Sequence, residues 1–150
     1  MATRSTIAME TIDGKVMQIY CHWDGYLDNN GKILYNHYQD PFKVRELMDL
    51  GDLSSLYPNI GEKHSFDDRV ACDGQCTFYG RDRGETGCEQ RKFRDYEDYV
   101  KNHQYEEYEY ILRKDGHWYV CQYGKGYELL GEATAQELKD RADEEQEALM

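Results

Sequence analysis

Several features that would place this 150-residue chain outside the ordinary globular proteins are missing from it. Proline occupies only two positions, and apolar residues make up 39% of the chain against 32% for charged ones, a balance typical of a folded domain rather than a disordered segment. No apolar run exceeds a few residues, which argues against a membrane-spanning helix. The first seven residues lack the apolar core of a secretion signal, so we expect a cytoplasmic protein.

A paired cysteine framework is missing as well. The cysteine count is five, and an odd number without an export signal favours reduced thiols over disulfides. Cys21 and Cys121 fall within strand-like patterns, where cysteine usually acts as a small buried hydrophobe.

Basic residues are scarce: 18 Lys and Arg stand against 30 Asp and Glu, for a net charge of −12. The imbalance is concentrated in residues 95–150, which carry 15 acids and 6 bases. Because a polyanion would be repelled, we expect neither direct duplex DNA binding nor membrane binding. The acidic residues either keep the protein soluble or dock on a basic surface of another protein.

The residue pattern predicts a single α+β domain over residues 1–150, with an antiparallel β-sheet of hairpins, three to four short helices and a C-terminal acidic helix. Asp13-Gly14 and Asp115-Gly116 predict two-residue turns, which would pair Ile12 with Lys15 in the first hairpin. In the second hairpin the same turn length would put one set of residues on the core face: Tyr108, Tyr110, Leu112, Tyr119, Cys121 and Tyr123.

Helix signals are clearest in two places. Asp40 as N-cap, Pro41 at the first position and Gly51 as the stop predict a helix between them. The capping box that begins at Thr134 predicts an acidic helix over residues 133–150, whose end we expect to fray because its acids oppose the helix dipole. Residues 58–91, which contain glycine, cysteine and arginine, read as an irregular loop region.

A metal site is one hypothesis for that loop region. His64, Cys72, Cys76 and Cys88 are four nitrogen and sulfur ligands that would suit a structural zinc ion. Their spacing is not that of a standard zinc knuckle, so reduced, packed thiols are the alternative. We expect no other cofactor.

Anion binding is a second hypothesis, for the loop that holds Gly80, Arg81, Arg83 and Gly84. Arginine forks together with glycine amides can hold a phosphate or a carboxylate. The alternative is that the arginines pair with neighbouring acids and only stabilise the loop. No Walker-type or dinucleotide-binding fingerprint supports a nucleotide site.

A catalytic signature is not found. Cys21, His22 and Asp24 are close in sequence, but adjacent strand residues point to opposite faces, so the thiol and the imidazole would not meet. Nothing in the sequence singles out His22, His37 or His117 as an acid or base. We therefore expect a non-enzymatic protein, and the alternative is an enzyme with a cleft in which one of the histidines meets a carboxylate.

Aromatic residues are abundant: the chain has 14 tyrosines and two tryptophans, more than a domain of this size buries. Exposed tyrosine and tryptophan are favoured contact residues. We predict an acidic, aromatic partner-binding surface, with a solvated sheet face as the alternative. The predicted surface consists of Tyr105, Glu106, Glu107, Glu109, Trp118, Glu144, Glu145 and Glu147.

Four stretches carry a resemblance. TRSTIA at residues 3–8, QIYCHWDGY at 18–26, GDLSSL at 51–56 and YGRDRGE at 79–85 resemble a group of small proteins encoded by tailed bacteriophages and prophages. The likeness spans most of the chain except the final acidic helix. That group has no assigned function, so the resemblance implies no catalytic residue. It implies a non-structural viral protein acting in the host cytoplasm.

Charge, aromatic content and this resemblance together lead to one functional hypothesis. We expect a bacteriophage accessory protein that binds and inhibits a host protein with a basic surface, such as a nucleic-acid-handling defence protein, in an anti-CRISPR-like manner. The alternative is a small-molecule binder that sequesters a phosphorylated nucleotide signal through the loop of Arg81 and Arg83.

Overall fold

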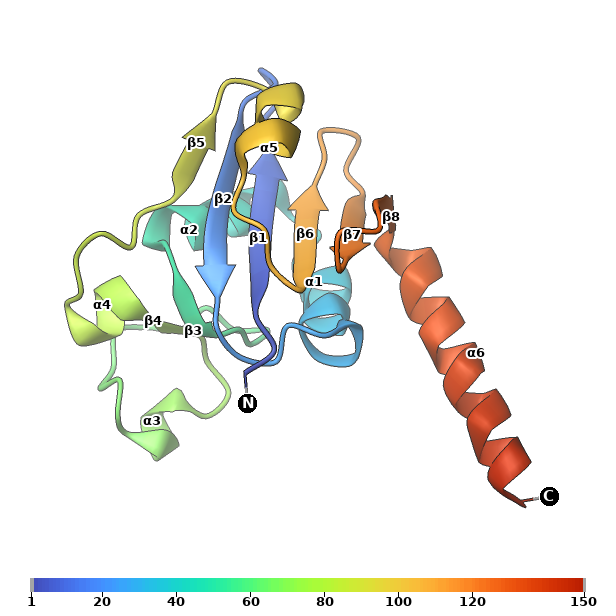
Figure 1. The fold of residues 1–150 in the computed structure, drawn as a ribbon. Coiled ribbons are helices and arrows are strands. Elements are labelled where there is room, and N and C mark those ends of the chain that lie inside the picture. Colours follow the sequence, from blue (N-terminus) through green and yellow to red (C-terminus); the bar gives the residue numbers. More distant parts are fainter. Residues whose placement is uncertain (1, 150) are drawn as a thin grey trace.

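The computed structural model describes residues 2–149; the side chains of 138, 141 and 144–149 lie outside the described part. Within that part, eight strands form one sheet, accompanied by six α-helices and a π-helical turn (Figure 1). The strands are β1 (Ser5–Glu10), β2 (Val16–Cys21), β3 (Leu53–Ser55), β4 (Thr77–Phe78), β5 (Arg91–Phe93), β6 (Tyr108–Leu112), β7 (Trp118–Gln122) and β8 (Tyr127–Leu129). The helices are η1 (Leu27–Gly31), α1 (Lys32–His37), α2 (Pro41–Leu50), α3 (Arg69–Cys72), α4 (Tyr79–Arg83), α5 (Tyr96–Asn102) and α6 (Leu130–Leu149).

The sheet is mixed, which corrects the prediction of a purely antiparallel one. Its strand order is β4-β3-β2-β1-β6-β7-β8, and β5 also pairs with β2. The β1–β6 and β2–β3 pairs are parallel. Between β5 and β6 the chain passes through α5, and such a crossover lets β6 lie parallel to β1. Turn residues indicate only hairpins between consecutive strands, so they did not predict that β6 lies parallel to β1.

The first hairpin forms with a three-residue turn instead of the predicted two-residue turn. The Thr11 N–H donates to Lys15 O at 2.8 Å, and Gly14 takes the left-handed conformation at φ 86°. Ile7 therefore pairs with Ile19. Ile12, predicted to pair with Lys15, lies in the turn and is 98% exposed.

The second hairpin has the same three-residue turn. The Arg113 N–H donates to His117 O at 3.0 Å, and Gly116 has a φ of 84°. The extra turn residue pairs Leu112 with Trp118, so the predicted face assignment of its second strand is wrong. Trp118, rather than Tyr119, shares the core face with Leu112. A one-residue change in turn length moves the whole second strand by one register step.

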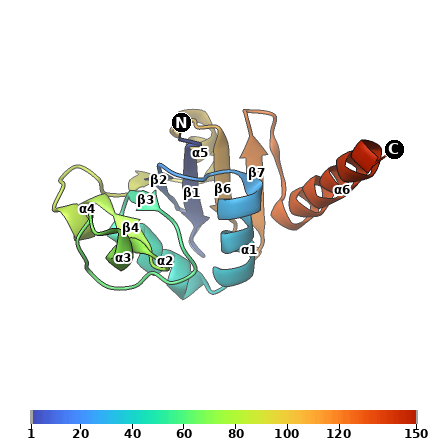
Figure 2. The ribbon, with the colours of Figure 1, turned by 90° about the horizontal axis from the view of Figure 1, so that it is seen from below.

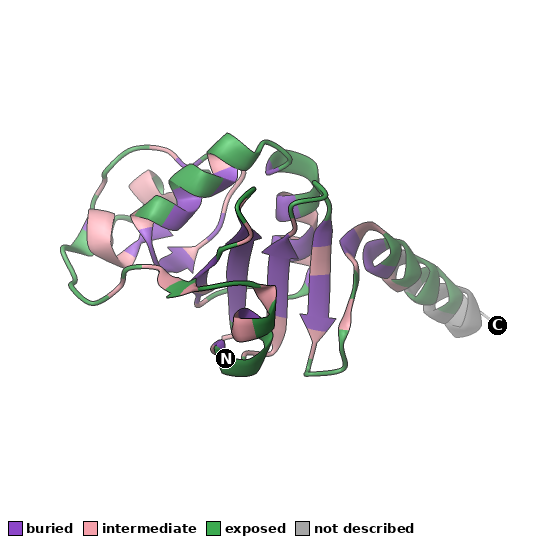
Figure 3. Ribbon diagram, turned by 90° about the horizontal axis from the view of Figure 1, so that it is seen from above, coloured by how far each residue is buried: buried purple, intermediate pink, exposed green. Residues whose placement is uncertain are grey.

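Helices cover both faces of the sheet. Figure 2 shows α1 and α2 on one side and α5 on the other. The larger core lies beneath α1 and α2 and includes Ile7, Ile19, Leu47 and Trp118. A smaller cluster beneath α5 includes Tyr99, and further partly buried aromatic side chains pack against it. All six residues of β1 are buried, in keeping with a strand covered on both faces (Figure 3).

Local helix signals were accurate for α2. The Asp40 side chain accepts from the Phe42 N–H at 2.9 Å, Pro41 opens the helix, and Gly51 ends it at φ 85°. Residues 58–91, predicted to be irregular, include α3, β4 and α4. No helix within residues 2–149 is both long and apolar enough to cross a membrane.

The last helix begins earlier than predicted. The capping box placed its start at residue 133, whereas α6 starts at Leu130, directly after β8. Thr134 does not cap it, because its hydroxyl donates to Leu130 O at 2.7 Å from inside the helix. We predicted that its end frays; in the structure the backbone is helical to Leu149.

Candidate partner-binding site at the base of helix α6

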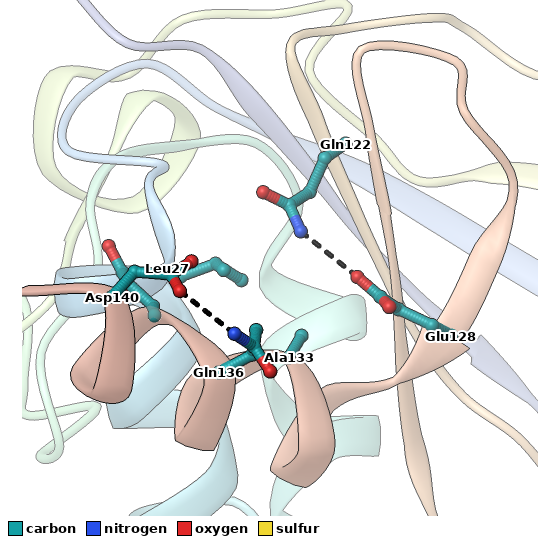
Figure 4. Close-up of a pocket in the computed structure, with 7 residues that line it drawn as sticks. Leu27, Gln122, Glu128, Ala133, Gln136 and Asp140 are labelled. Carbon is teal, nitrogen blue, oxygen red and sulfur yellow. Dashed lines mark hydrogen bonds between the residues drawn. The ribbon is translucent and has the colours of Figure 1, made fainter. Parts of the chain in front are cut away.

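A pocket of about 400 Å³ lies where α6 leaves the sheet (Figure 4). Buried Leu130 and Ala133 anchor the first turn of α6 on the core, and the rest of the helix extends away from the sheet (Figure 1). Residues from η1, β7, β8 and α6 line the pocket: Leu27, Gln122, Glu128, Ala133, Gln136, Glu137 and Asp140.

Three of the seven lining residues, Glu128, Glu137 and Asp140, carry carboxylates. Two of them are oriented by amides, since Gln122 Nε2 donates to Glu128 Oε1 at 3.1 Å and Gln136 Nε2 donates to Asp140 Oδ1 at 2.8 Å. Glu137 is the third carboxylate, and no lysine or arginine is among the described lining residues. The pocket therefore presents acceptors suited to a guanidinium or an ammonium group.

Two tyrosines border the pocket. The rings of Tyr108 and Tyr123 lie 5.4 Å apart, and Tyr123 is 60% exposed. A neighbouring hollow of about 460 Å³ has Tyr123 and Lys125 on its wall and shares Gln122 and Glu128 with the pocket. Burial raises the pKa of Tyr108 to about 12, with contributions from Tyr123 and from the charge of Glu137, so this ring keeps its hydroxyl proton at neutral pH.

Tyr123 adopts an unusual backbone conformation for a large residue. Its φ is 52°, in the left-handed region that costs a residue with a Cβ roughly 1–2 kcal/mol. Its N–H donates to Glu107 O at 2.8 Å, which holds the turn in place. The result is a ring presented to solvent beside an acidic pocket. We call the whole the α6-base surface, defined by Glu107, Tyr108, Gln122, Tyr123, Glu128, Gln136, Glu137 and Asp140.

The predicted partner-binding residues are not gathered on one surface. Trp118 is 3% exposed, with Nε1 donating to Tyr38 O at 2.9 Å. Glu109 is 1% exposed and accepts from the Tyr127 hydroxyl at 3.1 Å. Both predictions of surface residues are wrong, because the hairpin face assignment was shifted and because the second sheet face is covered by α5.

The remaining predicted contact residues have mixed positions. Tyr105 is 64% exposed but stacks near His103, with ring centroids 4.3 Å apart, on the α5 side of the sheet. Glu106 is half-buried and accepts from Gln104 Nε2 at 3.0 Å. Glu107 belongs to the α6-base surface. The side chains of Glu144, Glu145 and Glu147 lie outside the described part.

Tyr123, Glu128, Glu137 and Asp140 are residues that sequence reasoning missed. They come from the turn after β7, from β8 and from α6, which come together only in the folded chain. A local signal was present, because glycines at 124 and 126 mark a tight turn around the exposed ring. Nothing local indicated that α6 would start beside it.

The four predicted zinc ligands do not form one group. Among the described residues, no three His, Cys, Asp or Glu side chains are arranged to hold a metal ion. Cys76 is buried against Tyr38 and Tyr57, at 3.5 Å from the Tyr38 hydroxyl. Cys88 donates to Thr86 O at 3.6 Å, and all five thiols are free. Cys72 Sγ lies 3.8 Å from His64 Nδ1, whereas His64 meets Cys76 through the backbone carbonyl of Cys76 and not through its thiol.

In the predicted anion-binding loop, Arg81 already donates its hydrogen bonds to other groups of the protein. Arg81 Nε donates to Asp82 Oδ1 at 2.9 Å, and its terminal nitrogens donate to Ile60 O, Gly61 O and Cys76 O at 2.9 to 3.1 Å. Arg83 lies over the Phe66 ring. Gly80 is in α4, and Gly84 ends that helix at φ 73°. The loop therefore uses Arg81 for structure, as the ion-pair alternative expected.

No protein-family model, curated protein or solved structure matches the chain. The chemistry of the molecular surface is then the guide to function. Carboxylates beside exposed tyrosine rings are suited to holding lysine or arginine side chains, through charge-assisted hydrogen bonds and cation–π contacts.

Proposed function

We propose that this chain is a binding protein that docks on a basic surface of another protein through the α6-base surface. The observation that carries this proposal is the pocket between α6 and the sheet, which has three carboxylates and no basic lining residue among those described. The exposed Tyr123 lies in the neighbouring hollow, beside Lys125. Binding there requires no chemical step, so the proposed role is non-enzymatic.

The charge of α6 supports the same role. Residues 130–149 contain seven acids and two bases, and the helix extends away from the sheet (Figure 1). A projecting acidic element steers a basic partner toward the molecule and speeds encounter at low salt. The pocket at its base then provides a place where one partner side chain is enclosed.

An arginine is the best-matched anchor for that pocket. Its planar guanidinium bonds carboxylates in pairs and also stacks on aromatic rings. Glu128 and Asp140 supply oriented carboxylates, and Tyr123 supplies the ring. Anchors of this kind carry most of the energy at protein interfaces.

The partner that we propose is a host protein that handles nucleic acid, such as a defence protein. The sequence resembles phage-encoded proteins, and nucleic-acid-binding proteins carry basic grooves in which phosphates sit. An acidic protein seated in such a groove would compete with the nucleic acid and inhibit the host protein. The nucleotide-sequestering alternative gains no support, because Arg81 is already occupied by protein acceptors.

The test is affinity capture from bacterial host lysate with the immobilised full chain. The binding variant is Glu128→Gln/Glu137→Gln/Asp140→Asn. The matched control, Glu46→Gln/Glu62→Gln/Asp67→Asn, changes the charge equally but alters exposed residues on α2 and on the segment between β3 and α3. We expect the wild type and the control to retain a specific partner, and the binding variant to lose it by at least about tenfold in affinity.

Salt provides the second arm of this experiment. Capture should weaken steadily as sodium chloride is raised, because exposed charges are screened beyond about 10 Å at 0.1 M. A partner held equally by both triple variants, or with an affinity that does not respond to salt, would overturn the proposal.

A further inference from the structure

Cys72, His64 and Asp82 come from separate segments and meet in the folded chain. Cys72 Sγ lies 3.8 Å from His64 Nδ1, and His64 Nε2 lies 3.5 Å from Asp82 Oδ2. A thiol, an imidazole and a carboxylate in this order form the arrangement of an activated nucleophile. We propose that Cys72 is a nucleophile that accepts acyl groups from activated esters or thioesters, with His64 as its base and Asp82 as a positioning residue.

The surroundings of His64 select the tautomer that this chemistry needs. Both ring nitrogens face a backbone carbonyl, since Nε2 lies 3.1 Å from Cys76 O and Nδ1 lies 3.0 Å from Ser65 O. Nε2 also lies 3.5 Å from the Asp82 carboxylate, and this negative charge favours the tautomer with the proton on Nε2. In that tautomer the lone pair of Nδ1 is available to the Cys72 thiol, which also has Phe66 O at 3.3 Å. After Nδ1 takes the thiol proton, Ser65 O at 3.0 Å is in place to accept from the new N–H.

Asp82 is held as a buried carboxylate. It accepts from the Phe78 N–H at 2.7 Å, the His64 N–H at 3.1 Å and Arg81 Nε at 2.9 Å. Burial by itself would raise the pKa of Asp82, but the hydrogen bonds from Arg81 and the backbone outweigh it, and the pKa lies below its ordinary value. The carboxylate therefore stays charged, and it both orients His64 and stabilises the imidazolium.

The thiol is reachable from solvent. Cys72 is half-exposed on the wall of an open pocket of about 370 Å³, which Ser55, Tyr57, Arg69, Val70 and Asp73 also line. Arg69 and Asp73 bring opposite charges to this wall. We expect Arg69 to favour an acyl group with an anionic substituent.

Cys21, Cys76 and Cys121 are buried, whereas Cys72 is half-exposed. Burial raises the pKa of Cys21 to about 12 and also raises the pKa values of Cys76 and Cys121. Cys88 is partly exposed, and its pKa is raised by burial and by nearby acids such as Glu85.

The site is distinct from the proposed binding surface, since α3 and α6 lie at opposite ends of the molecule (Figure 1). The proposal for Cys72 therefore goes beyond the proposed function, and the two are tested independently.

The chemical step is a transfer of an acyl group to sulfur. The thiol proton passes to His64 Nδ1 as Sγ forms a bond to the carbonyl carbon. The bond from that carbon to the leaving oxygen or sulfur breaks, and the leaving group departs with the proton. Water can then attack the thioester with His64 accepting its proton, which releases the acid and restores the thiol.

The first test uses p-nitrophenyl acetate and the full wild-type chain, with peptide mass mapping of each cysteine over time. We expect one equivalent of nitrophenol to be released as Cys72 is acetylated, at least about 100-fold faster than Cys88, because a positioned base contributes about 10²–10⁴ in rate. Cys88 serves as a reference within the same molecule. Equal acetylation of the two thiols would overturn the proposal without any variant being made.

His64→Gln and Asp82→Asn test the two supporting roles. His64→Gln should slow acetylation of Cys72 about 100-fold. The rate of an imidazole-assisted thiol is already high near neutral pH, whereas that of an ordinary thiol keeps rising to about pH 9. We expect the wild type to show the first profile and both variants the second. An unchanged rate and profile in His64→Gln would also overturn the proposal.

The preference for charged acyl groups has its own comparison. Arg69→Gln should slow reaction with the mono-p-nitrophenyl ester of succinate while leaving reaction with the acetate unchanged. If both esters react as in the wild type, Arg69 has no part in selecting the acyl group, and the site takes neutral acyl groups.

Discussion

At the scale of single residues, His103 and Glu109 form an ion pair that is almost fully buried. Their side chains are 3% and 2% exposed, and His103 Nε2 contacts Glu109 Oε1 directly. His103 Nδ1 donates to Tyr99 O at 2.6 Å, and the Tyr127 hydroxyl donates to Glu109 at 3.1 Å. Burial would lower the pKa of His103, but the hydrogen bond and charge of Glu109 outweigh it, so the pKa lies above its ordinary value of 6.5.

This pair predicts a particular pH dependence of stability. Because the folded-state pKa of His103 is raised, its contribution is fully present below about pH 6.5 and is lost as pH rises through the folded-state value. Glu109→Gln should reduce the free energy of unfolding by about 3 kcal/mol at pH 6, since it leaves a buried histidine without its partner. Urea unfolding at pH values between 6 and 9 measures both effects.

The control for this prediction is the pH dependence of the free energy of unfolding, compared between the wild type and Glu109→Gln. The wild type should lose stability over that pH range, and the loss should be much smaller in Glu109→Gln. Parallel stability curves for the two proteins would show that His103 does not keep its raised pKa.

At the scale of elements, the junction between α2 and β3 depends on Gly51. Its φ of 85° and ψ of −154° lie in a region used almost only by glycine. A Cβ at this position would lie 2.4 Å from Cys88 O, the same carbonyl that accepts from the Asp52 N–H at 2.9 Å. Arg91 strengthens this junction through paired hydrogen bonds to Asp52 at 2.6 and 3.0 Å.

Gly51→Ala should therefore be strongly destabilising. Backbone strain of up to about 3 kcal/mol adds to a collision with a main-chain atom, so we expect a loss of at least about 3 kcal/mol in urea unfolding. Gly116→Ala is the matched control, because Gly116 has φ 84° but nothing lies within 4 Å of its added Cβ. That variant should lose only about 1–2 kcal/mol. Equal losses would mean that the contact with Cys88 is unimportant.

At the scale of the whole molecule, the net charge of −12 acts on folding and on binding in opposite ways. Like charges destabilise the compact state by mutual repulsion, and salt screens that repulsion. Salt also screens attraction to a basic partner. The two effects can therefore be separated by measuring stability and affinity over the same salt series.

We predict that the thermal midpoint of the free protein rises between 20 and 300 mM sodium chloride, while partner capture weakens. A gain of about 1 kcal/mol corresponds to a rise of roughly 2–4 °C for a domain of this size. Neutralising Glu132, Asp140 and Asp143 should reduce the rise, since all three lie on α6. Differential scanning calorimetry gives the midpoints, and a midpoint that falls with salt would contradict the prediction.

Much of the local structure was predictable from the sequence. The boundaries of α2 followed from Asp40, Pro41 and Gly51, and both hairpins were located by their Asp-Gly pairs. The same pairs misjudged turn length by one residue, because Asp-Gly serves two-residue and three-residue turns alike. That single residue moved Trp118 from a predicted contact surface into the core.

The candidate site was much less predictable than the fold. Composition predicted an acidic, aromatic surface, but the residues of the α6-base surface that combine the two lie in the turn after β7, on β8 and on α6. His64 and Cys72 were grouped as metal ligands, whereas the structure adds Asp82 to them and places Cys76 and Cys88 elsewhere. Side chains from distant segments meet only once the strands have paired.

By itself, the sequence determined where the chain turns, where α2 begins and ends, and that the molecule is strongly acidic, because capping, turn conformation and charge are properties of a few neighbouring residues. Only the tertiary structure decided that β6 lies parallel to β1, that α6 leaves the sheet beside Tyr123, and that Cys72 faces His64. Those outcomes depend on how surfaces far apart in sequence pack together, and no local preference encodes them.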